Sequence, residues 1–299
     1  MICSQENQLK AHSASLYALA KGRTVNTVFT AGADRVVAEW NLNAQEPNPF
    51  AIRVESTVYS LLTIDRQRLI IGTGVGGIHT IDLLSKKEIK HLKLHNKGIF
   101  HLHHDTVNHR IYSSSADGTV SVWDAESWEL LWHLQCTDQK VRRTTTNPDG
   151  SLAAICCGDG RCLVLETQQH RIIQELDAHA DSCNAAAFTA DGQLLTGGKD
   201  AHLKRWDIKN GFQLKKAIPA HNFAIYDIVV APNSNWIATA SRDKTIKIWD
   251  HDLEEKPVRL DRKSHDGHIN SVNGMIFLED ENRLVSCSDD RSAIIWRID

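Results

Sequence analysis

The 299-residue sequence is poor in several kinds of residue, and each shortage excludes a class of protein. Aromatic residues make up 6% and there are only six prolines, yet 41% of the residues are hydrophobic, too many for a disordered chain. No apolar run approaches the roughly 18 residues of a membrane-spanning helix. The first residues form neither a basic nor an apolar segment, so we expect no secretory leader and a cytoplasmic protein.

The chain also lacks an excess of positive charge. Its 34 Lys and Arg residues stand against 37 Asp and Glu residues, which gives a net charge of −3. Proteins that bind nucleic acid without regard to sequence usually carry a clear basic excess, because they neutralise phosphates. The charge balance therefore argues against a nucleic-acid partner.

Cysteine pairs with metal-binding spacing are absent as well. The seven cysteines include no CxxC pair, and no second set of ligands follows the group Cys156, Cys157 and Cys162. A zinc site needs four converging ligands. We therefore expect free cysteines in a reducing compartment and neither a metal nor another cofactor. The histidines His101, His103, His104 and His109 also lack accompanying acids or cysteines, so we expect them to be solvated or to lie between structural units.

What the sequence does contain is a repeat of about 42 residues. In five segments an aspartate lies six residues before a tryptophan, and two weaker copies place Ile81 and Leu165 at the tryptophan position. Successive positions are 41, 42, 42, 41, 43 and 47 residues apart, so we expect residues 1–299 to form one domain of seven copies. Each copy has the alternation and β-branched content of short strands, without helical periodicity. Such units must stack, and only a closed ring leaves none at an exposed edge.

Further residues recur in phase with the aspartate. A histidine lies 22 residues before it in four copies and 21 before it in a fifth, and a serine or threonine lies four residues before it. The five tetrads are His12, Thr30, Asp34 and Trp40; His95, Ser113, Asp117 and Trp123; His179, Thr196, Asp200 and Trp206; His221, Thr239, Asp243 and Trp249; and His268, Ser286, Asp290 and Trp296. With these tetrads the sequence resembles the WD-repeat β-propeller family over essentially its whole length.

The resemblance implies an all-β fold, a seven-bladed β-propeller of four-stranded antiparallel blades. The last copy ends directly after its third strand, and residues Cys3–Lys10 precede the first histidine where a fourth strand is expected. We therefore expect this N-terminal strand to complete the last blade and close the ring. Blade 2 has lost its tetrad, with Val75 at the aspartate position, and blade 4 keeps only Asp159.

The tetrads contain the residue types of a hydrolytic triad, but five copies would make five active sites. A repeated structural cross-brace explains them better, because buried polar groups that satisfy one another stiffen a blade. We therefore assign the tetrads a structural role and expect no catalytic residue.

In this family the position five residues after the histidine opens the innermost strand at the mouth of the channel. The seven residues at this position, called the crown residues below, are Tyr17, Tyr59, Phe100, Arg142, Asn184, Tyr226 and Asn273. Three of the four tyrosines of the chain are among them. Tyrosine combines apolar area with a hydroxyl group, as binding hot spots do. The alternative is that these rings pack against the neighbouring blade or plug the channel.

The residue before each aspartate faces the same rim and is a cation in blades 5 and 6, Lys199 and Arg242. Together with Lys140, Arg142 and Arg143 of blade 4, these residues give blades 4 to 6 a basic arc. The candidate partner-binding residues are Tyr17, Tyr59, Phe100, Arg142, Lys199, Tyr226 and Arg242. They predict a non-catalytic scaffold, monomeric on its own, that binds an acidic or phosphorylated protein or peptide through its top face. RNA recognition through the same residues and an enzyme with its site at the channel mouth are the alternatives.

Overall fold

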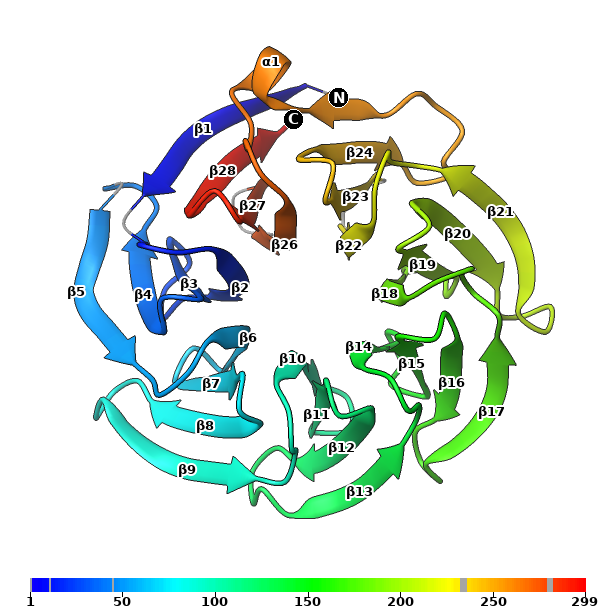
Figure 1. Cartoon of the computed structure of the whole chain (residues 1–299), viewed down its shortest axis with the longest axis horizontal. Coiled ribbons are helices and arrows are strands. Elements are labelled where there is room, and N and C mark those ends of the chain that lie inside the picture. Colours follow the sequence, from blue (N-terminus) through cyan, green and yellow to red (C-terminus); the bar gives the residue numbers. More distant parts are fainter. Residues whose placement is uncertain (1, 11, 45, 232–235, 279–281) are drawn as a thin grey trace.

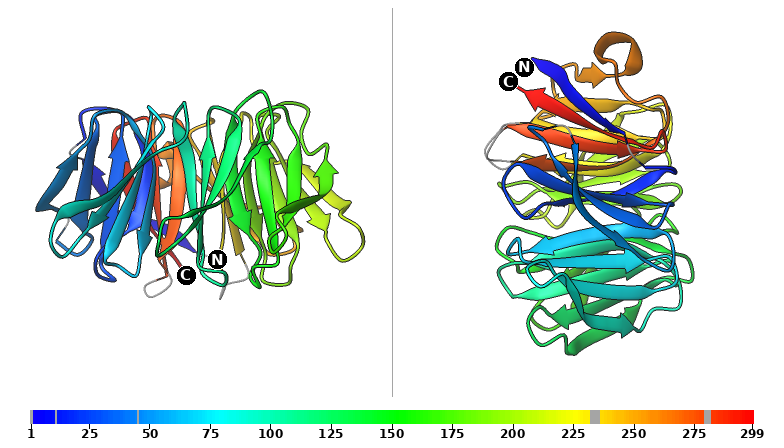
Figure 2. Two further views of the ribbon diagram at one scale, coloured as in Figure 1. Left: turned by 90° about the horizontal axis from the view of Figure 1, so that it is seen from below. Right: turned by 90° about the vertical axis from the view of Figure 1, so that its left-hand side faces the viewer.

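The computed structural model describes residues 2–10, 12–44, 46–231, 236–278 and 282–299. Seven four-stranded antiparallel sheets surround a central channel (Figure 1), and from the side they form a disc (Figure 2). The seven-bladed propeller is therefore confirmed.

The first strand of each blade lies at the channel and the fourth at the outer rim. Blade 1 contains β2 (Leu16–Lys21), β3 (Thr27–Gly32), β4 (Val36–Asn41) and β5 (Glu46–Arg53), and blade 2 contains β6 (Val58–Ile64), β7 (Arg68–Thr73), β8 (Gly77–Asp82) and β9 (Lys87–Lys93). Blade 3 contains β10 (Ile99–Asp105), β11 (Arg110–Ser115), β12 (Thr119–Asp124) and β13 (Leu130–Gln135), and blade 4 contains β14 (Val141–Thr146), β15 (Leu152–Cys157), β16 (Cys162–Glu166) and β17 (Arg171–Leu176). Blade 5 contains β18 (Cys183–Phe188), β19 (Leu194–Gly198), β20 (His202–Asp207) and β21 (Gln213–Pro219), and blade 6 contains β22 (Ile225–Val230), β23 (Trp236–Ser241), β24 (Ile246–Asp250) and β25 (Val258–Leu260). Blade 7 contains β26 (Val272–Leu278), β27 (Arg283–Ser288), β28 (Ser292–Ile298) and β1 (Cys3–Lys10).

The N-terminal strand closes the ring. Strand β1 pairs with β28 from Cys3 opposite Ile298 to Lys10 opposite Ser292, and the side chains of Cys3 and Leu9 are buried. Figure 1 shows β1 outside β28, with both termini beside blade 7. The expectation that Cys3–Lys10 would complete the last blade is confirmed.

The hydrophobic core lies between the blades. Every residue of β3 and β23 is buried, whereas exposure alternates along the outer strands β5 and β13. One core cluster joins Trp236 of blade 6 to Phe277 of blade 7, whose rings meet edge to face with centroids 5.1 Å apart. Because each blade buries its faces against its neighbours, the ring positions the channel-lining strands rigidly.

The connection between β25 and β26 contains one short helix, α1 (Arg262–His265), which the strand pattern did not predict. Asp261 caps it by accepting a hydrogen bond from the Ser264 amide at 2.9 Å. Among the described residues, no helix is long and apolar enough to cross a bilayer.

Candidate functional site

The tetrad residues meet inside the blades, away from the channel. In each of the five tetrads the indole Nε1 donates to the buried hydroxyl at 2.7–3.0 Å, and the histidine Nε2 lies 2.7–3.0 Å from the same oxygen. An indole can only donate, so each hydroxyl accepts from its tryptophan. Where the histidine Nδ1–H donates to the carboxylate, which can only accept, Nε2 is left to accept a hydrogen bond from the hydroxyl. In four blades that carboxylate lies 2.8–2.9 Å from Nδ1. All five hydroxyl residues are fully buried, so a substrate has no access to them.

Blade 3 builds its tetrad differently. Thr119 Oγ1 lies 2.8 Å from His95 Nδ1, while the Asp117 carboxylate stands back at 3.5 Å and accepts from Thr119 at 2.6 Å. Burial lowers the pKa of His95 to about 4, although Asp117 opposes the shift. The inserted hydroxyl was not expected from the sequence.

Blade 4 has a threonine in place of the tetrad histidine. Thr137 occupies the histidine position, 22 residues before Asp159, and donates to its carboxylate at 2.8 Å. In blade 2 the hydroxyl and tryptophan positions hold the buried Ile71 and Ile81, and Val75 is 60% exposed. Blade 2 therefore has no buried polar brace at these positions.

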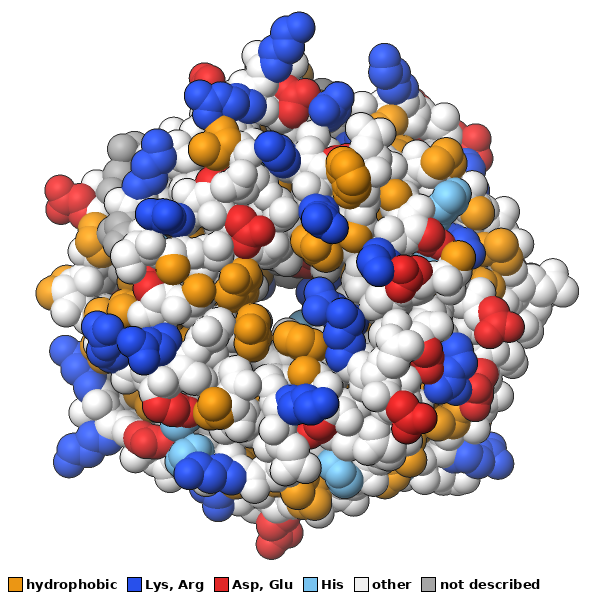
Figure 3. Space-filling model, viewed as in Figure 1, with side chains coloured by type: hydrophobic (Ala, Val, Ile, Leu, Met, Phe, Trp, Pro, Cys, Tyr) orange, Lys and Arg blue, Asp and Glu red, His pale blue; other side chains and the backbone are white. Residues whose placement is uncertain are grey.

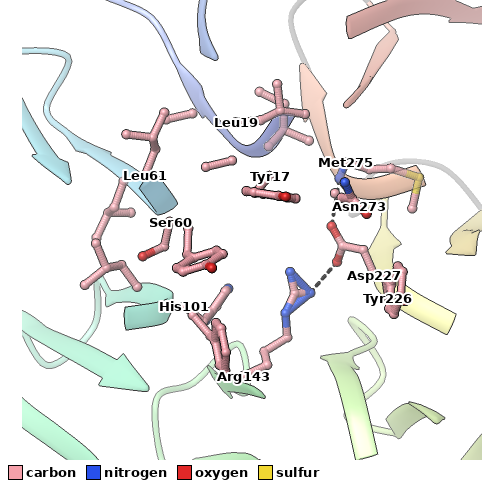
Figure 4. A pocket seen from close by; sticks show the side chains of 18 of the residues that line it. Tyr17, Leu19, Ser60, Leu61, His101, Arg143, Tyr226, Asp227, Asn273 and Met275 are labelled. Atoms are coloured by element: carbon pink, nitrogen blue, oxygen red, sulfur yellow. Dashed lines mark hydrogen bonds and ion pairs between the residues drawn. The ribbon is translucent and has the colours of Figure 1, made fainter. Parts of the chain in front are cut away.

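The seven crown residues share a structural cause for their orientation. In every blade the register between the first and second strands shifts at the crown residue, for example between Leu16 and Ala18 in blade 1 and between Val58 and Ser60 in blade 2. Each crown residue is thus the extra residue of a β-bulge, which turns a side chain out of the ladder. All seven line one cavity of about 780 Å³ in the channel (Figure 4).

Four crown side chains form a continuous row across blades 1 to 4. The ring centroids of Tyr17 and Tyr59 are 5.4 Å apart, those of Tyr59 and Phe100 are 5.3 Å apart, and the Arg142 guanidinium lies 4.9 Å above Phe100. A Cβ added at Gly98 would lie only 3.1 Å from the Tyr59 ring, so the absence of a side chain at Gly98 leaves room for this ring. The three rings pack on one another and also line the cavity. They therefore contact neighbouring blades and remain accessible from the channel at the same time.

The charges around the channel opening are unevenly distributed. Figure 3 shows hydrophobic side chains on one side of the opening and Lys and Arg side chains on the other. Figure 4 shows Arg143 reaching across the cavity to Asp227, with which it forms an ion pair. Asp227 also accepts from the Met275 amide at 2.8 Å, and burial raises the pKa of its carboxyl despite Arg143. The basic arc expected from the sequence is therefore partly neutralised, because Asp227 was not included in it.

The other crown positions connect neighbouring blades. Asn184 donates to the Ile225 carbonyl at 3.0 Å, and Asn273 donates to the Leu16 carbonyl and to Asp289, both at 2.8 Å. Tyr226 also lines the cavity. These asparagines connect neighbouring blades, whereas the aromatic row, Arg142 and Tyr226 are the other crown side chains that line the cavity.

Two predicted cations lie outside the channel cavity. Lys199 is exposed and pairs with Asp181 at 2.8 Å, and Arg242 lies 5.9 Å above the ring of Phe223. Phe223 is 57% exposed, and with Arg242 and Tyr17 it lines a second, shallower depression of about 560 Å³. Phe223 was missed from the sequence because it stands two residues after His221, where no other blade has an aromatic residue.

The cysteine group gains a member that the sequence did not suggest. Cys156 of β15, Cys162 of β16 and Cys183 of β18 in the next blade are fully buried, and their sulfur atoms lie within 4.8 Å of one another. Cys157 is not part of this trio. Cys183 joins Cys156 and Cys162 from blade 5, a contact that the spacing of the cysteines in the sequence did not indicate.

The four histidines that are close in the sequence, His101, His103, His104 and His109, lie in different environments. His101 lines the channel and stacks with His103 at 6.4 Å, and His103 lies 2.8 Å from the Thr146 hydroxyl of blade 4. His104 lines the channel further along, and His109 sits in a turn with positive φ. Among the described residues these four do not form a group of metal ligands.

Comparisons with known proteins agree with the architecture. The sequence profile described as "WD domain, G-beta repeat" matches residues 86–124, 170–207, 212–250 and 261–297. Transducin-like enhancer protein 2 of Mus musculus is 24% identical over 184 residues, which are 60% of this chain and 23% of that protein. WD repeat-containing protein 37 of Homo sapiens is 27% identical over 190 residues, 62% of this chain and 38% of that protein. The chain thus spans well under two thirds of these relatives. By its repeats, its blades and the profile match, the chain belongs to the WD-repeat β-propeller family.

Proposed function

We propose that this protein is a non-catalytic scaffold that binds a partner protein or peptide at the channel mouth. The observation that carries the proposal is the row of Tyr17, Tyr59, Phe100 and Arg142, which four successive β-bulges turn into one cavity. WD-repeat propellers generally serve as platforms for other proteins, and this row gives the platform a specific surface. The free cysteines, all buried, agree with a reducing compartment such as the cytoplasm.

The aromatic row supports an apolar anchor on the partner. Tyr17, Tyr59 and Phe100 are half-buried, so each ring keeps an open face while its neighbour fixes its position. Rings that are already ordered lose little conformational entropy on binding. Aromatic residues with such support are typical of binding hot spots.

The cations on the opposite side support an acidic or phosphorylated group on the partner. Among the described residues Arg142 has no carboxylate within ion-pair distance, and burial together with the charge of Arg143 lowers its pKa. Burial and the charges of Arg142 and Lys199 likewise lower the pKa of Lys140. An anion bound here would relieve the repulsion among these side chains and could be held by the planar guanidinium.

The second depression extends the same surface toward blades 6 and 7. Phe223 and Arg242 repeat, at the outer side of Tyr17, the combination of an aromatic ring and a guanidinium found at the channel mouth. A peptide lying from the channel to this depression would meet both pairs.

The carboxylates that line the cavity support binding over catalysis. Asp227 is paired with Arg143, and Asp289 accepts from Asn273. Both carboxylates therefore make contacts within the ring.

The test is affinity purification with wild-type protein beside the variant Tyr17→Ala, Tyr59→Ala and Tyr226→Ala. A matched control replaces three exposed outer-strand residues, Leu130, Ile173 and Leu214, with alanine. We expect the tyrosine variant to lose its partner while the control retains it. Retention by the tyrosine variant at an unchanged melting temperature would refute the proposal. Recovery of RNA with steeply salt-dependent binding would favour the nucleic-acid alternative.

A further inference from the structure

The outer part of blade 2 brings together two histidines that the partner-binding surface does not use. His79 on β8 and His91 on β9 are direct cross-strand partners, and their rings stack at a centroid distance of 4.1 Å with an angle of 19°. His79 is buried, whereas His91 is exposed. One imidazole therefore lies in a fixed position and the other covers it from the solvent side.

A carboxylate from the same outer strand completes the group. Glu88 Oε1 lies 2.8 Å from His79 Nδ1. His79, Glu88 and His91 each offer one ligand atom, and these atoms all lie within 4.8 Å of one another. Two ligands bound at about 2.1 Å in a tetrahedral arrangement are about 3.4 Å apart, so Nδ1 and Oε1 need to separate by only a few tenths of an ångström to share an ion.

We propose that His79, Glu88 and His91 form a binding site for a divalent transition-metal ion of the Zn²⁺ class. Two imidazoles and one carboxylate select Zn²⁺, Co²⁺ or Ni²⁺ over Ca²⁺ and Mg²⁺, which prefer sites made of oxygen atoms alone. Three protein ligands leave further coordination positions for water. The exposed His91 and Glu88 give the ion a direct path from solvent.

A second carboxylate orients the buried histidine. Glu55 Oε1 lies 3.2 Å from His79 Nε2 and accepts from the Thr73 hydroxyl at 3.3 Å. Metal-binding histidines commonly hold their second nitrogen against a carboxylate in this way, which fixes the ring and strengthens its donor atom. Glu55 thus leaves Nδ1 of His79 for the ion.

Gly77 leaves room for the two histidine rings. A Cβ added at Gly77 would stand 3.1 Å from His79 Nε2 and 3.2 Å from His91 Nε2, so any other residue would crowd both rings. The equivalent residues of three tetrad blades are Thr119, Thr245 and Ser292, whose hydroxyls bond to the tetrad aspartate. Blade 2 has lost that aspartate, and its glycine accommodates the histidine pair instead.

Blade 3 provides a matched control at the same register. There Ser121 of β12 lies opposite His133 of β13, so the outer strand carries a histidine but the facing residue is a serine. His133 hydrogen-bonds to Ser121 at 2.9 Å. Replacing His133 removes a histidine of equal position without touching the proposed site.

The experiment titrates the untagged full chain with Co²⁺, followed by its ligand-field absorption, and with Zn²⁺ in calorimetry. We expect one equivalent to bind, and His91→Asn and Glu88→Gln each to weaken that binding at least tenfold. His133→Asn should bind as wild type does, and Glu55→Gln should weaken binding about 10–100-fold. Excess Ca²⁺ or Mg²⁺ should not displace the ion.

Two results would overturn the site. One is equal Co²⁺ affinity of wild type, His91→Asn and His133→Asn, which would assign the binding to other histidines. The other is no saturable one-to-one binding by wild type. Because both substituted ligands are exposed on the outermost strand, unchanged circular dichroism and melting in the presence of a chelator will show that these variants remain folded.

Discussion

Blades 6 and 2 are both four-stranded parts of the ring, but they differ inside. Blade 6 has the polar tetrad, and blade 2 has apolar residues at the hydroxyl and tryptophan positions. In blade 6 the Thr239 hydroxyl accepts from Trp249 at 2.9 Å and lies 2.8 Å from His221, which in turn lies 2.9 Å from Asp243. In blade 2 the positions of Thr239 and Trp249 are occupied by the buried Ile71 and Ile81. Both blades nevertheless have four strands in the same order.

The comparison teaches that the tetrad is not needed to form a blade. A buried hydrogen bond contributes about 1 kcal/mol net, and replacing both partners with apolar groups of similar shape is nearly neutral. Removing only one partner lowers the free energy of unfolding, because the other partner is left buried without a hydrogen bond. Blade 2 has apolar residues at both the hydroxyl and the tryptophan positions, and its polar contacts lie elsewhere, among them those of His79 with Glu55 and Glu88.

We expect the largest loss of stability from removing strand β1, because it is the strand that closes the ring. Deletion of residues 1–9 exposes the edge of β28 and the buried partners of Cys3 and Leu9. We expect the melting temperature to fall by about eight degrees, since a loss of about 5 kcal/mol corresponds to that shift in a domain of this size. Differential scanning calorimetry measures the change. A melting temperature equal to that of the full chain would show that closure by β1 does not stabilise the ring.

The contrast between tetrad and apolar blades can be tested with single substitutions. Thr239→Val should cost about 2–4 kcal/mol, because it leaves His221 and Trp249 with buried, unsatisfied nitrogen atoms. At the equivalent position of blade 2, Ile71→Val should cost only about 1 kcal/mol, the loss of one methyl group. Urea denaturation measures both. Equal costs would mean that the tetrad hydroxyl contributes only packing.

Blades 3 and 7 also differ in how acid affects their stability. Burial lowers the pKa of His95 and His103 in blade 3 to about 4, so the folded protein keeps both neutral while the unfolded chain protonates them near pH 6.5. Their contribution is complete above pH 6.5 and is lost as the pH falls toward 4, by at most about 1.4 kcal/mol per pH unit for each histidine. In blade 7 the pKa of Asp290 is lowered to about 2, so its contribution is complete above about pH 4 and disappears only as the pH falls toward 2.

The measurement is the free energy of unfolding between pH 7 and pH 4, with His103→Gln as the variant. We expect its slope against pH to be shallower than that of wild type. Parallel slopes would contradict the assignment of a neutral, buried His103.

The ring was predictable from the sequence because its evidence repeats. The phase of histidine, hydroxyl, aspartate and tryptophan recurs five times, and a last copy with only three strands indicates where Cys3–Lys10 must lie. The contacts that were missed each occur once and join distant segments, such as Arg143 with Asp227 and Cys162 with Cys183. Repeat spacing carries no information about such pairs, because they depend on how two blades meet.

The crown residues could be predicted only in part. Their spacing from the histidine placed them at the channel, but the β-bulge that turns each side chain is a property of backbone pairing that residue types do not reveal. The pairing of Lys199 with Asp181 likewise needed the folded loops.

The central claim, that the aromatic row is the recognition surface, is tested most directly by site-specific photo-crosslinking. A photoreactive residue at position 59 lies in the row, and one at position 130 lies on the outer strand β13, where Leu130 is 45% exposed. The account predicts a crosslink to the partner protein from position 59 and none from position 130. A crosslink from position 130 without one from position 59 would contradict it.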